Sequence, residues 1–407
     1  MDLALALLRR GYHALPAERR RNGGADTFVT RMLGGRAVVV RGRAGAELFY
    51  DTDRVSRVGA VPPPVAGLIF GRGALHGLDG AEHAERKALF LDLLDGAAVQ
   101  EVTGEVTALL RPRLDALAAQ PDGGEVVLFD LLVEAYGDAV LRWAGVPGSA
   151  EERRVLARRM AAIVDGFGGA GTAYVRGWRE RLRLNRWAAR LVRETRRTAS
   201  VDATSVVARI AATDLDDRTA GVELLNVLRP TVAVAWPATW AALTLAVDRS
   251  ARAALVGDAG ARARVCVAHE SRRVHPFVPA LAGRIRSETE HDGVRLRPGD
   301  HLVLDVPGTD TDPAWWDRPE ELDPSRFAHA EPDPYAYVPQ GGGHPDQGHR
   351  CPGEPLTVAL VATTLGELAR HDITPVDDQP GRTDRTRMPR RPHGGLRLRV
   401  RTTDPSA

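Results

Sequence analysis

The sequence predicts a mainly α-helical protein with small β-sheets near both ends. From about residue 80 to residue 275, most stretches place apolar side chains at a spacing near 3.6 residues, which is typical of amphipathic helices. Before and after this region, short β-prone runs alternate with turns rich in glycine, proline and aspartate. Hydrophobic residues make up 43% and charged residues 27% of the 407 residues, the balance of a globular protein. Because no linker divides the sequence, we expect a single domain over residues 1–407.

The expected elements follow in order along the chain. A β-rich N-terminal lobe at about 25–60 contains "TFVTRMLGGRAVVVRG", where Gly34 and Gly35 separate two β-prone runs and indicate a hairpin. The helical core at about 80–275 includes "AEHAERKALFLDLL", "VTALLRPRLDALAAQ", "LFDLLVEAYGDAVLRWAG" and "YVRGWRERLRLNRWAARLVRETRR". Later β-prone pieces are "HLVLDV" and "LRLRVR", and one further helix is expected at about 354–371.

Charge and hydropathy exclude two classes of partner. The 55 basic and 53 acidic residues give a net charge of +2 and are spread along the whole chain, so no basic stripe predicts nucleic-acid binding. The apolar stretch 230–247 approaches the length of a membrane span, but its two prolines and the preceding Arg229 favour a buried core helix. At the N-terminus the arginines follow the apolar start and no small-residue cleavage site is present, so we expect a cytoplasmic protein rather than a secreted one.

The chain has two cysteines, Cys266 and Cys351, which excludes a disulfide framework and a four-cysteine zinc site. Cys266 lies in "ARVCVAHESRR" and is interpreted as an ordinary core residue. Cys351 follows the glycine-rich run "YVPQGGGHPDQGHRC" and precedes an apolar helix, with Pro352 suited to the first helical position. A thiolate is favoured at such a helix N-terminus, so residues 337–353 form a candidate site.

Three interpretations of Cys351 are open from the residues alone. Free cysteines are among the most buried residue types, so the first is a simple core cysteine. The second is a zinc site with His344, Asp346 and His349, although their spacing matches no usual zinc finger. The third is a haem-thiolate site, because a glycine-rich loop can bring one soft ligand and several backbone N–H groups to a flat cofactor.

Over nearly its whole length the chain resembles the cytochrome P-450 superfamily. "ESRR" carries the Glu270 and Arg273 pair of that family's ExxR helix, and "PEELDPSRF" resembles its meander, with Arg326 completing a buried triad. The resemblance implies the cytochrome P-450 fold, a single haem-thiolate domain, and haem b whose iron takes Cys351 as axial ligand. It also implies that His83 and Lys87 in "DGAEHAERK", and Arg284 in "ALAGRIR", contact the haem propionates, where the simpler alternative for the first two is an exposed helix face.

The central helix departs from the pattern of most members. Where they carry an acid-alcohol pair for proton delivery, this chain has "LRPTVAVA", and Thr231 has no acidic neighbour. The Arg229-Pro230 pair, the lengthened loop "PQGGGHPDQGHRCPGE" and the segment "FGRGALHGLDG" are similar to the branch of hydrogen-peroxide-dependent fatty-acid hydroxylases and decarboxylases. Without these matches, a structural salt bridge to a distant Asp or Glu is the simpler role for Arg229.

This second resemblance assigns roles to the remaining candidates. A planar guanidinium pairs bidentately with a carboxylate, so Arg229 is expected to bind the fatty-acid head group, and that carboxylate would then move the peroxide proton. Pro230 is expected to shape the helix beside the haem. Phe70, Leu75 and Phe277 are expected to line the acyl channel, although each would also fit a plain core. His76 stands where the branch carries histidine or glutamine, so we expect it to influence the balance of hydroxy acids and terminal alkenes, unless it only lines the pocket.

The sequence therefore predicts a peroxygenase that uses H2O2 to oxidise long- or medium-chain fatty acids at the α or β carbon, with no reductase needed. One alternative is a reductase-dependent monooxygenase that acts on another carboxylate-bearing substrate, and another is a haem sensor or carrier without turnover. Tyr337 replaces the phenylalanine usual at the start of the cysteine loop, and Pro237 adds a second helix breaker, so the pocket shape is left open.

Overall fold

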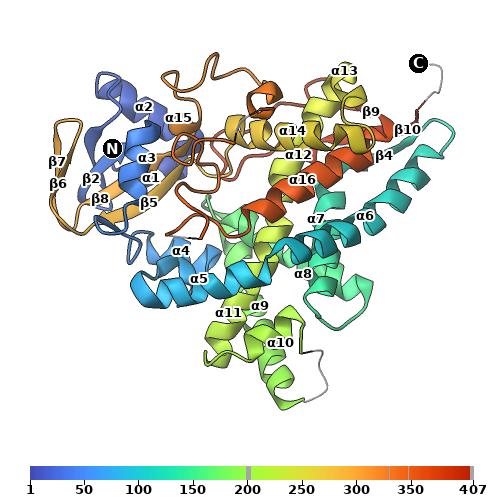
Figure 1. Ribbon diagram of the computed structural model, residues 1–407, viewed down its shortest axis with the longest axis horizontal. Helices are drawn as coiled ribbons and strands as arrows, with labels where there is room; N and C mark the ends of the chain where they lie inside the picture. Colours follow the sequence, from blue (N-terminus) through green and yellow to red (C-terminus); the bar gives the residue numbers. More distant parts are fainter. Residues whose placement is uncertain (199–202, 330, 347, 404–407) are drawn as a thin grey trace.

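The structure is a computed structural model, and it describes residues 1–198, 203–329, 331–346 and 348–403, except the side chains at 249–250. Its larger part is helical, and a small sheet lies at one end, where the N-terminal strands meet strands from residues 280–305 (Figure 1). The prediction of a mainly α-helical fold with small sheets is confirmed.

The central helices are α11 (Asp217–Ala233) and α12 (Ala235–Val247), which cross the body and pack against most of the other large helices. Those are α5 (Gly80–Leu93), α6 (Gly96–Ala118), α7 (Leu128–Trp143), α8 (Ala150–Gly166), α9 (Thr172–Arg197), α10 (Val206–Ala211), α14 (Ala261–Val274) and α16 (Glu354–Ala369). The smaller helices are α1 (Leu3–Arg10), α2 (Ala14–Arg21), α3 (Gly42–Tyr50), α4 (Pro63–Ile69), α13 (Arg249–Ala253) and α15 (Val306–Asp310). All of the helices that the sequence predicts are therefore present.

The main sheet has five strands in the order β1 (Phe28–Met32), β2 (Gly35–Val40), β8 (His301–Asp305), β5 (Ala280–Ile285) and β3 (Val55–Ser56). The predicted hairpin joins β1 to β2, but its turn residues are Leu33 and Gly34, one residue earlier than expected. Both have positive φ, 53° and 78°, as a two-residue hairpin turn requires, and Gly35 begins the second strand. The parallel pairing of β2 with β8 adds residues 301–305 to the N-terminal lobe.

Two smaller sheets complete the fold. The strand β10 (Arg397–Thr402) lies between β4 (Gly124–Val127) and β9 (His371–Pro375), and it ties the C-terminal segment to the helical body. The other sheet is the hairpin of β6 (Thr289–His291) and β7 (Val294–Leu296).

The central helix is interrupted at Val234, which separates α11 from α12. Pro237 explains the position of this break, because it has no N–H for the carbonyl of Ala233 and its ring crowds that carbonyl. Among the described residues, Asp217–Val247 is the one segment long and apolar enough to cross a membrane, and 72% of its apolar window is buried inside the protein. That burial fits the core helix expected from the sequence.

The predicted ExxR triad is confirmed. Glu270 and Arg273 are fully buried and form a two-pronged ion pair with both N–O distances at 2.7 Å, and Arg326 approaches Glu270 at 3.4 Å. Arg273 also donates to the carbonyls of Asp310, Pro319 and Glu321. Every charge of this cluster has a partner, which a buried ion pair needs if it is not to destabilise the fold.

Candidate active site

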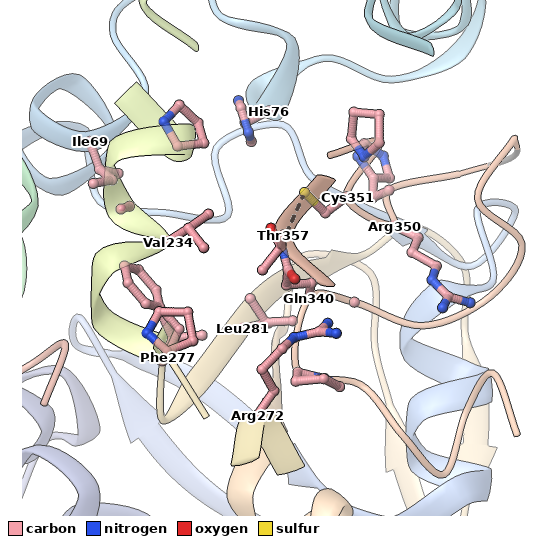
Figure 2. A pocket seen from close by; sticks show the side chains of 18 of the residues that line it. Ile69, His76, Val234, Arg272, Phe277, Leu281, Gln340, Arg350, Cys351 and Thr357 are labelled. Atoms are coloured by element: carbon pink, nitrogen blue, oxygen red, sulfur yellow. Dashed lines mark hydrogen bonds between the residues drawn. The ribbon is translucent and has the colours of Figure 1, made fainter. Parts of the chain in front are cut away.

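A cavity of about 320 Å³ lies between the Arg229 to Trp240 stretch and the loop that carries Cys351. Figure 2 shows Cys351 and Gln340 on one side of it, with His76, Val234 and Phe277 facing them. The predicted residues that line this cavity are Phe70, Leu75, His76, His83, Lys87, Arg229, Pro230, Phe277 and Cys351. Arg284 does not line it, because it lies in β5 and its guanidinium donates to the carbonyls of Gly59 and Gly299.

Cys351 lies just before α16 and is held by polar groups on its sulfur side. The amide Nε2 of Gln340 is 3.7 Å from its Sγ and also donates to Oγ1 of Thr357 at 3.1 Å. Burial raises the pKa of the Cys351 thiol, although the Gly353 N–H and the Gln340 amide oppose this rise. The helix begins at Glu354, so Pro352 belongs to the preceding turn and Pro355, not Pro352, occupies the first helical turn.

The charges beneath the cysteine loop neutralise one another. Glu354 forms ion pairs with Arg272 and, at 2.8 Å, with Arg350. Although burial opposes its ionisation, these two cations lower the pKa of Glu354. Arg272 and Arg350 line the cavity but already have an anion.

The glycines of the cysteine loop have a packing role besides the close approach to a flat ligand expected from the sequence. Gly341 has φ of 106°, and a side chain there would meet Tyr50 at 3.0 Å and the backbone of Arg350 at 3.1 Å. A side chain at Gly342 would meet the carbonyl of Pro334 at 2.8 Å. The loop is therefore folded tightly on itself and on α3, and this compact shape presents Cys351 to the cavity.

A basic group lies at the edge of the cavity near this loop. His83 and Lys87 are buried on α5, and the ring of His83 is 4.0 Å from that of His349. Lys87 donates to the carbonyls of Gly348 at 2.6 Å and Arg350 at 3.1 Å. Burial lowers the pKa of Lys87 to about 8. His83 and Lys87 are thus buried, so the alternative of an exposed helix face is wrong.

Arg229 projects from α11 into the cavity and is 4% exposed. No described Asp or Glu forms an ion pair with it, its Nε has no acceptor, and Nη2 reaches only Oδ1 of Asn226 at 3.5 Å. Burial, followed by the nearby charge of Arg181, lowers its pKa to about 9. The salt bridge to a distant acid, which was the alternative role for Arg229, is absent from the described part of the chain.

The acid nearest to Arg229 on the same helix is Glu223, and it is already occupied. Its Oε1 accepts from the Leu75 backbone N–H at 2.8 Å and from Arg86 at 2.9 Å, and its Oε2 accepts from Asn226 at 3.1 Å. The fully buried Glu223 therefore joins α11 to α5 and to the Leu75 segment, and through Asn226 it reaches Arg229.

A second buried arginine, Arg181 of α9, supports the same wall. Its Nη2 donates to the carbonyl of Phe70 at 2.9 Å, and its Nε and Nη1 have no partner. A side chain at Gly71 would lie 2.0 Å from Arg181, so this glycine is required for the close approach. The wall that carries Phe70 is therefore strongly positive.

His76 stacks on Phe70, with ring centroids 4.1 Å apart and planes at 16°. Its side chain has exposed surface, which faces the cavity, yet enough protein surrounds the ring that desolvation, then Arg229, lowers its pKa to about 3. The positive wall opposes a charged imidazole in the same direction as burial does. His76 is therefore neutral near pH 7, so any influence on the products would come from the neutral ring.

Thr231 has no access to the cavity. It is 3% exposed, and its hydroxyl donates to the carbonyl of Val227 at 3.2 Å, within the helix. Both parts of an acid-alcohol pair are thus missing from the cavity wall beside Pro230, since Thr231 points into the helix and Glu223 is tied to other groups.

The cavity fits a haem held by Cys351. Because burial opposes ionisation of the Cys351 thiol, a bound metal cation is needed to keep it as a thiolate. The neighbouring N–H groups can then stabilise the sulfur. His83 and Lys87, to which the resemblance assigns the haem propionates, lie at the cavity edge beside His349, whose Nε2 is 3.2 Å from Oδ1 of Asp79. The described residues gather no set of three or more His, Cys, Asp or Glu that could hold a metal ion, so the zinc alternative has no ligand set there.

Several residues in or near the cavity wall were given no role in a haem site from the sequence. Gln340 lines the cavity, and so does His349, which the sequence suggested only as a zinc ligand; both lie in the cysteine loop, so the loop was a signal for both. Asn226 stands three residues before Arg229, and Glu223 three residues before Asn226, so each is a helix neighbour of the next, which is a usable signal in sequence. Arg390 and Arg181 come from distant segments, and no local pattern indicates them.

Comparison with known proteins agrees with this geometry. The family described as Cytochrome P-450 matches residues 266–371. A Mycobacterium tuberculosis protein named as cytochrome P-450 number 137 is 26% identical over 430 residues, which cover 98% of this chain and 87% of that protein.

Two solved structures are more similar. P-450SP alpha in complex with (R)-ibuprofen has 33% identity and a TM-score of 0.90, with 98% of each chain covered. A mutant of OleT in complex with arachidonic acid has 30% identity and a TM-score of 0.91, and the match covers 100% of this chain and 98% of that one. With the ExxR triad and the Cys351 loop in place, the chain belongs to the cytochrome P-450 family, within the group that includes P-450SP alpha and OleT.

Proposed function

We propose that the protein is a haem-thiolate peroxygenase that uses H2O2 to oxidise fatty acids at the α or β carbon. The observation that carries this proposal is Arg229, a buried guanidinium on the cavity wall without an anion in the described part of the chain. Arachidonic acid, found with OleT, and ibuprofen, found with P-450SP alpha, are both carboxylic acids, and a carboxylate is the group that a guanidinium fork binds best.

Haem b, held by Cys351 with its propionates near His83, Lys87 and His349, would supply the iron chemistry that transfers oxygen from peroxide. Gln340 donates toward the sulfur of Cys351, and such a contact would tune how strongly this sulfur donates electrons to the iron.

Arg229 would fix the substrate carboxylate at one point of the cavity, so only the first carbons of the chain lie near the reacting centre. The held carboxylate can accept a proton from hydrogen peroxide and return it to the departing water. This replaces the acid-alcohol pair that the cavity wall lacks, because the Thr231 hydroxyl bonds to the helix backbone. Pro230, next to Arg229, removes a backbone donor at this place.

The rest of the substrate would meet an apolar wall. Phe70, Leu75 and Phe277 line the cavity, and Phe70 is fixed by its carbonyl contact to Arg181. His76 stacks on Phe70 as a neutral ring, so it would act on the substrate through hydrogen bonding and shape. We expect both hydroxy acids and terminal alkenes among the products.

The test is an incubation of the haem-loaded protein with a saturated fatty acid and H2O2, followed by mass analysis. We expect oxidised acid without any reductase, and at least a hundredfold lower turnover in Arg229→Ala, since breaking a buried ion pair costs about 3–5 kcal/mol. Near-normal turnover in that variant would contradict the proposal. Turnover that requires an electron donor would favour the reductase-dependent monooxygenase instead.

A further inference from the structure

The arginines that line the cavity fall into two kinds. Among the described side chains, the arginines that line it are Arg229, Arg272, Arg350 and Arg390. Arg272 and Arg350 share Glu354, whereas no described Asp or Glu forms an ion pair with Arg390. Arg390 thus shares with Arg229 the property that marks a binding site for an anion.

The immediate contacts of Arg390 leave its charge unbalanced. Its Nη2 donates to the carbonyl of Val274 at 2.7 Å and contacts Nδ1 of His275 at 3.1 Å, while its Nε is buried without an acceptor. The guanidinium lies 5.1 Å from the ring of Tyr12 and 5.5 Å from that of Trp240, contacts that stabilise a cation without neutralising it. Burial lowers its pKa to about 10, which agrees with a cation that lacks a carboxylate.

The part of α12 that lines the cavity also contains a hydrogen-bond donor. Trp236 lines the cavity, is 1% exposed, and its indole N–H has no acceptor. A buried donor without a partner costs about 1–3 kcal/mol, so a ligand that brings an acceptor here would recover that free energy.

Arg390 and Arg229 lie at different ends of the cavity. The charges that act on Arg229 include Cys351, whereas those that act on Arg390 are Tyr12, Arg385 and Glu320. Trp240 donates to the carbonyl of Arg390 at 3.2 Å and follows Arg229 by eleven residues. At about 1.5 Å per residue, this separates the two ends by about 16 Å along the central helices.

The wall between the two ends is apolar. Ala233, Val234 and Phe277 line this part of the cavity, and Figure 2 shows Val234 and Phe277 on the same side of the space. A molecule that spans the part of the cavity from Arg229 to Arg390 therefore has an acidic group at each end and a hydrocarbon chain between them.

We propose that the cavity is shaped for an α,ω-dicarboxylic acid, with one carboxylate on Arg229 and the second on Arg390. This rests on the proposed function, which assigns the first carboxylate to Arg229, and it adds the chemical class of the substrate tail. The Arg390 guanidinium would bind an ω-carboxylate, whereas a methyl end would leave its charge without an anion.

The test measures, by calorimetry on the haem-loaded protein, the affinities of saturated monoacids and α,ω-diacids with eight to sixteen carbons. We expect one range of diacid lengths to bind at least tenfold more tightly than the monoacids of equal length. In Arg390→Gln this advantage falls to less than threefold, while the monoacid affinity stays within twofold of wild type. Arg391→Gln is the matched control, because this neighbour pairs with Asp165 at 2.9 Å and does not line the cavity, so the advantage persists there.

A measurement without mutation protects the test against a folding defect in Arg390→Gln. The monomethyl ester of the best diacid keeps one carboxylate for Arg229 and has no second charge, so we expect it to bind like the monoacid in wild-type protein. Equal affinities of diacid, half-ester and monoacid at every length overturn the proposal. If monoacids are still oxidised in that case, the proposed peroxygenase function stands and only the diacid preference falls; if no acid binds, both fall.

Discussion

The two sides of the cavity treat buried charge in opposite ways. Beneath the cysteine loop, Glu354 is bonded to Arg272 and Arg350, and further out Glu270 is bonded to Arg273 and Arg326.

On the opposite side, Arg229, Arg181 and Arg390 are desolvated, and no described carboxylate pairs with any of them. Paired buried charges fix a fold, because each group has a partner whether or not ligand is present. Unpaired cations lower the stability of the empty protein, and a ligand of opposite charge recovers that free energy. The paired charges therefore stabilise the structure around the site, whereas the unpaired arginines are available to bind an anionic ligand.

The largest effect should come from the single thiol on the paired side. In Cys351→Ala, we expect the reduced carbon monoxide complex to lose the red-shifted Soret band of thiolate ligation, because Cys351 is the cysteine that lines the cavity. The spectrum of haem-loaded protein is the measurement. Cys266→Ala is the control, since Cys266 packs in a separate hydrophobic cluster with Trp316 and Tyr337. Survival of the band in Cys351→Ala would mean that another group binds the iron.

The same substitution on the two sides should change stability in opposite ways. Arg273→Met removes a partner from fully buried Glu270 and should cost about 3–5 kcal/mol. Arg229→Met removes a buried cation that has no described anion, so the free energy of unfolding should stay within about 1 kcal/mol of wild type or rise. Urea unfolding of the ligand-free proteins measures both. A large loss of stability in Arg229→Met would assign Arg229 to the structural side.

Glu223 is an exception on the side of the unpaired arginines, because this buried carboxylate has hydrogen-bond partners. In Glu223→Gln the neutral amide accepts more weakly from Leu75, Arg86 and Asn226 than the carboxylate does. We therefore expect Arg229 and the Leu75 segment to lose their fixed positions. Turnover should fall about tenfold through kcat, while fatty-acid affinity stays within threefold, because the cation that binds the carboxylate is unchanged. A fall in affinity with unchanged kcat would contradict this positioning role.

A histidine on the paired side predicts how stability depends on pH. Burial, then Arg272, lowers the pKa of His269 to about 4, against 6.5 in the unfolded chain. Between these values the unfolded chain binds more protons, so His269 lowers stability as pH falls from about 6.5 to about 4. The urea midpoint of His269→Gln should therefore decline less over this range than that of wild type. Parallel declines would mean that other groups cause the acid sensitivity.

The smallest effect concerns product choice. Because His76 is neutral in the cavity, the ratio of alkene to hydroxy acid should not change between pH 6 and 9 in wild-type protein. In His76→Gln we expect a modestly lower alkene share, since the amide keeps neutrality but changes the shape and hydrogen bonding beside Phe70. Product analysis under single-turnover peroxide measures the ratio, and an unchanged ratio in the variant would remove His76 from this role.

The sequence by itself determined the elements and most of the site. Apolar periodicity indicated the large helices, and the order of ExxR, meander and cysteine loop indicated the haem-thiolate fold. The motif residues Cys351, Arg229, His83 and Lys87 were all found at the cavity. Their place at the cavity could be predicted because each belongs to a motif whose residues are close together in the chain, where helix geometry fixes their relation.

The tertiary structure decided which charges are paired and where the cavity ends. Arg284 has a local pattern that suggests a haem contact, but its strand turns it to the carbonyls of Gly59 and Gly299. Arg390 has no local pattern, and it reaches the cavity because the C-terminal segment packs against Tyr12 and Trp240. Whether an arginine has a partner depends on contacts between segments hundreds of residues apart, and burial, which only packing creates, makes that difference large.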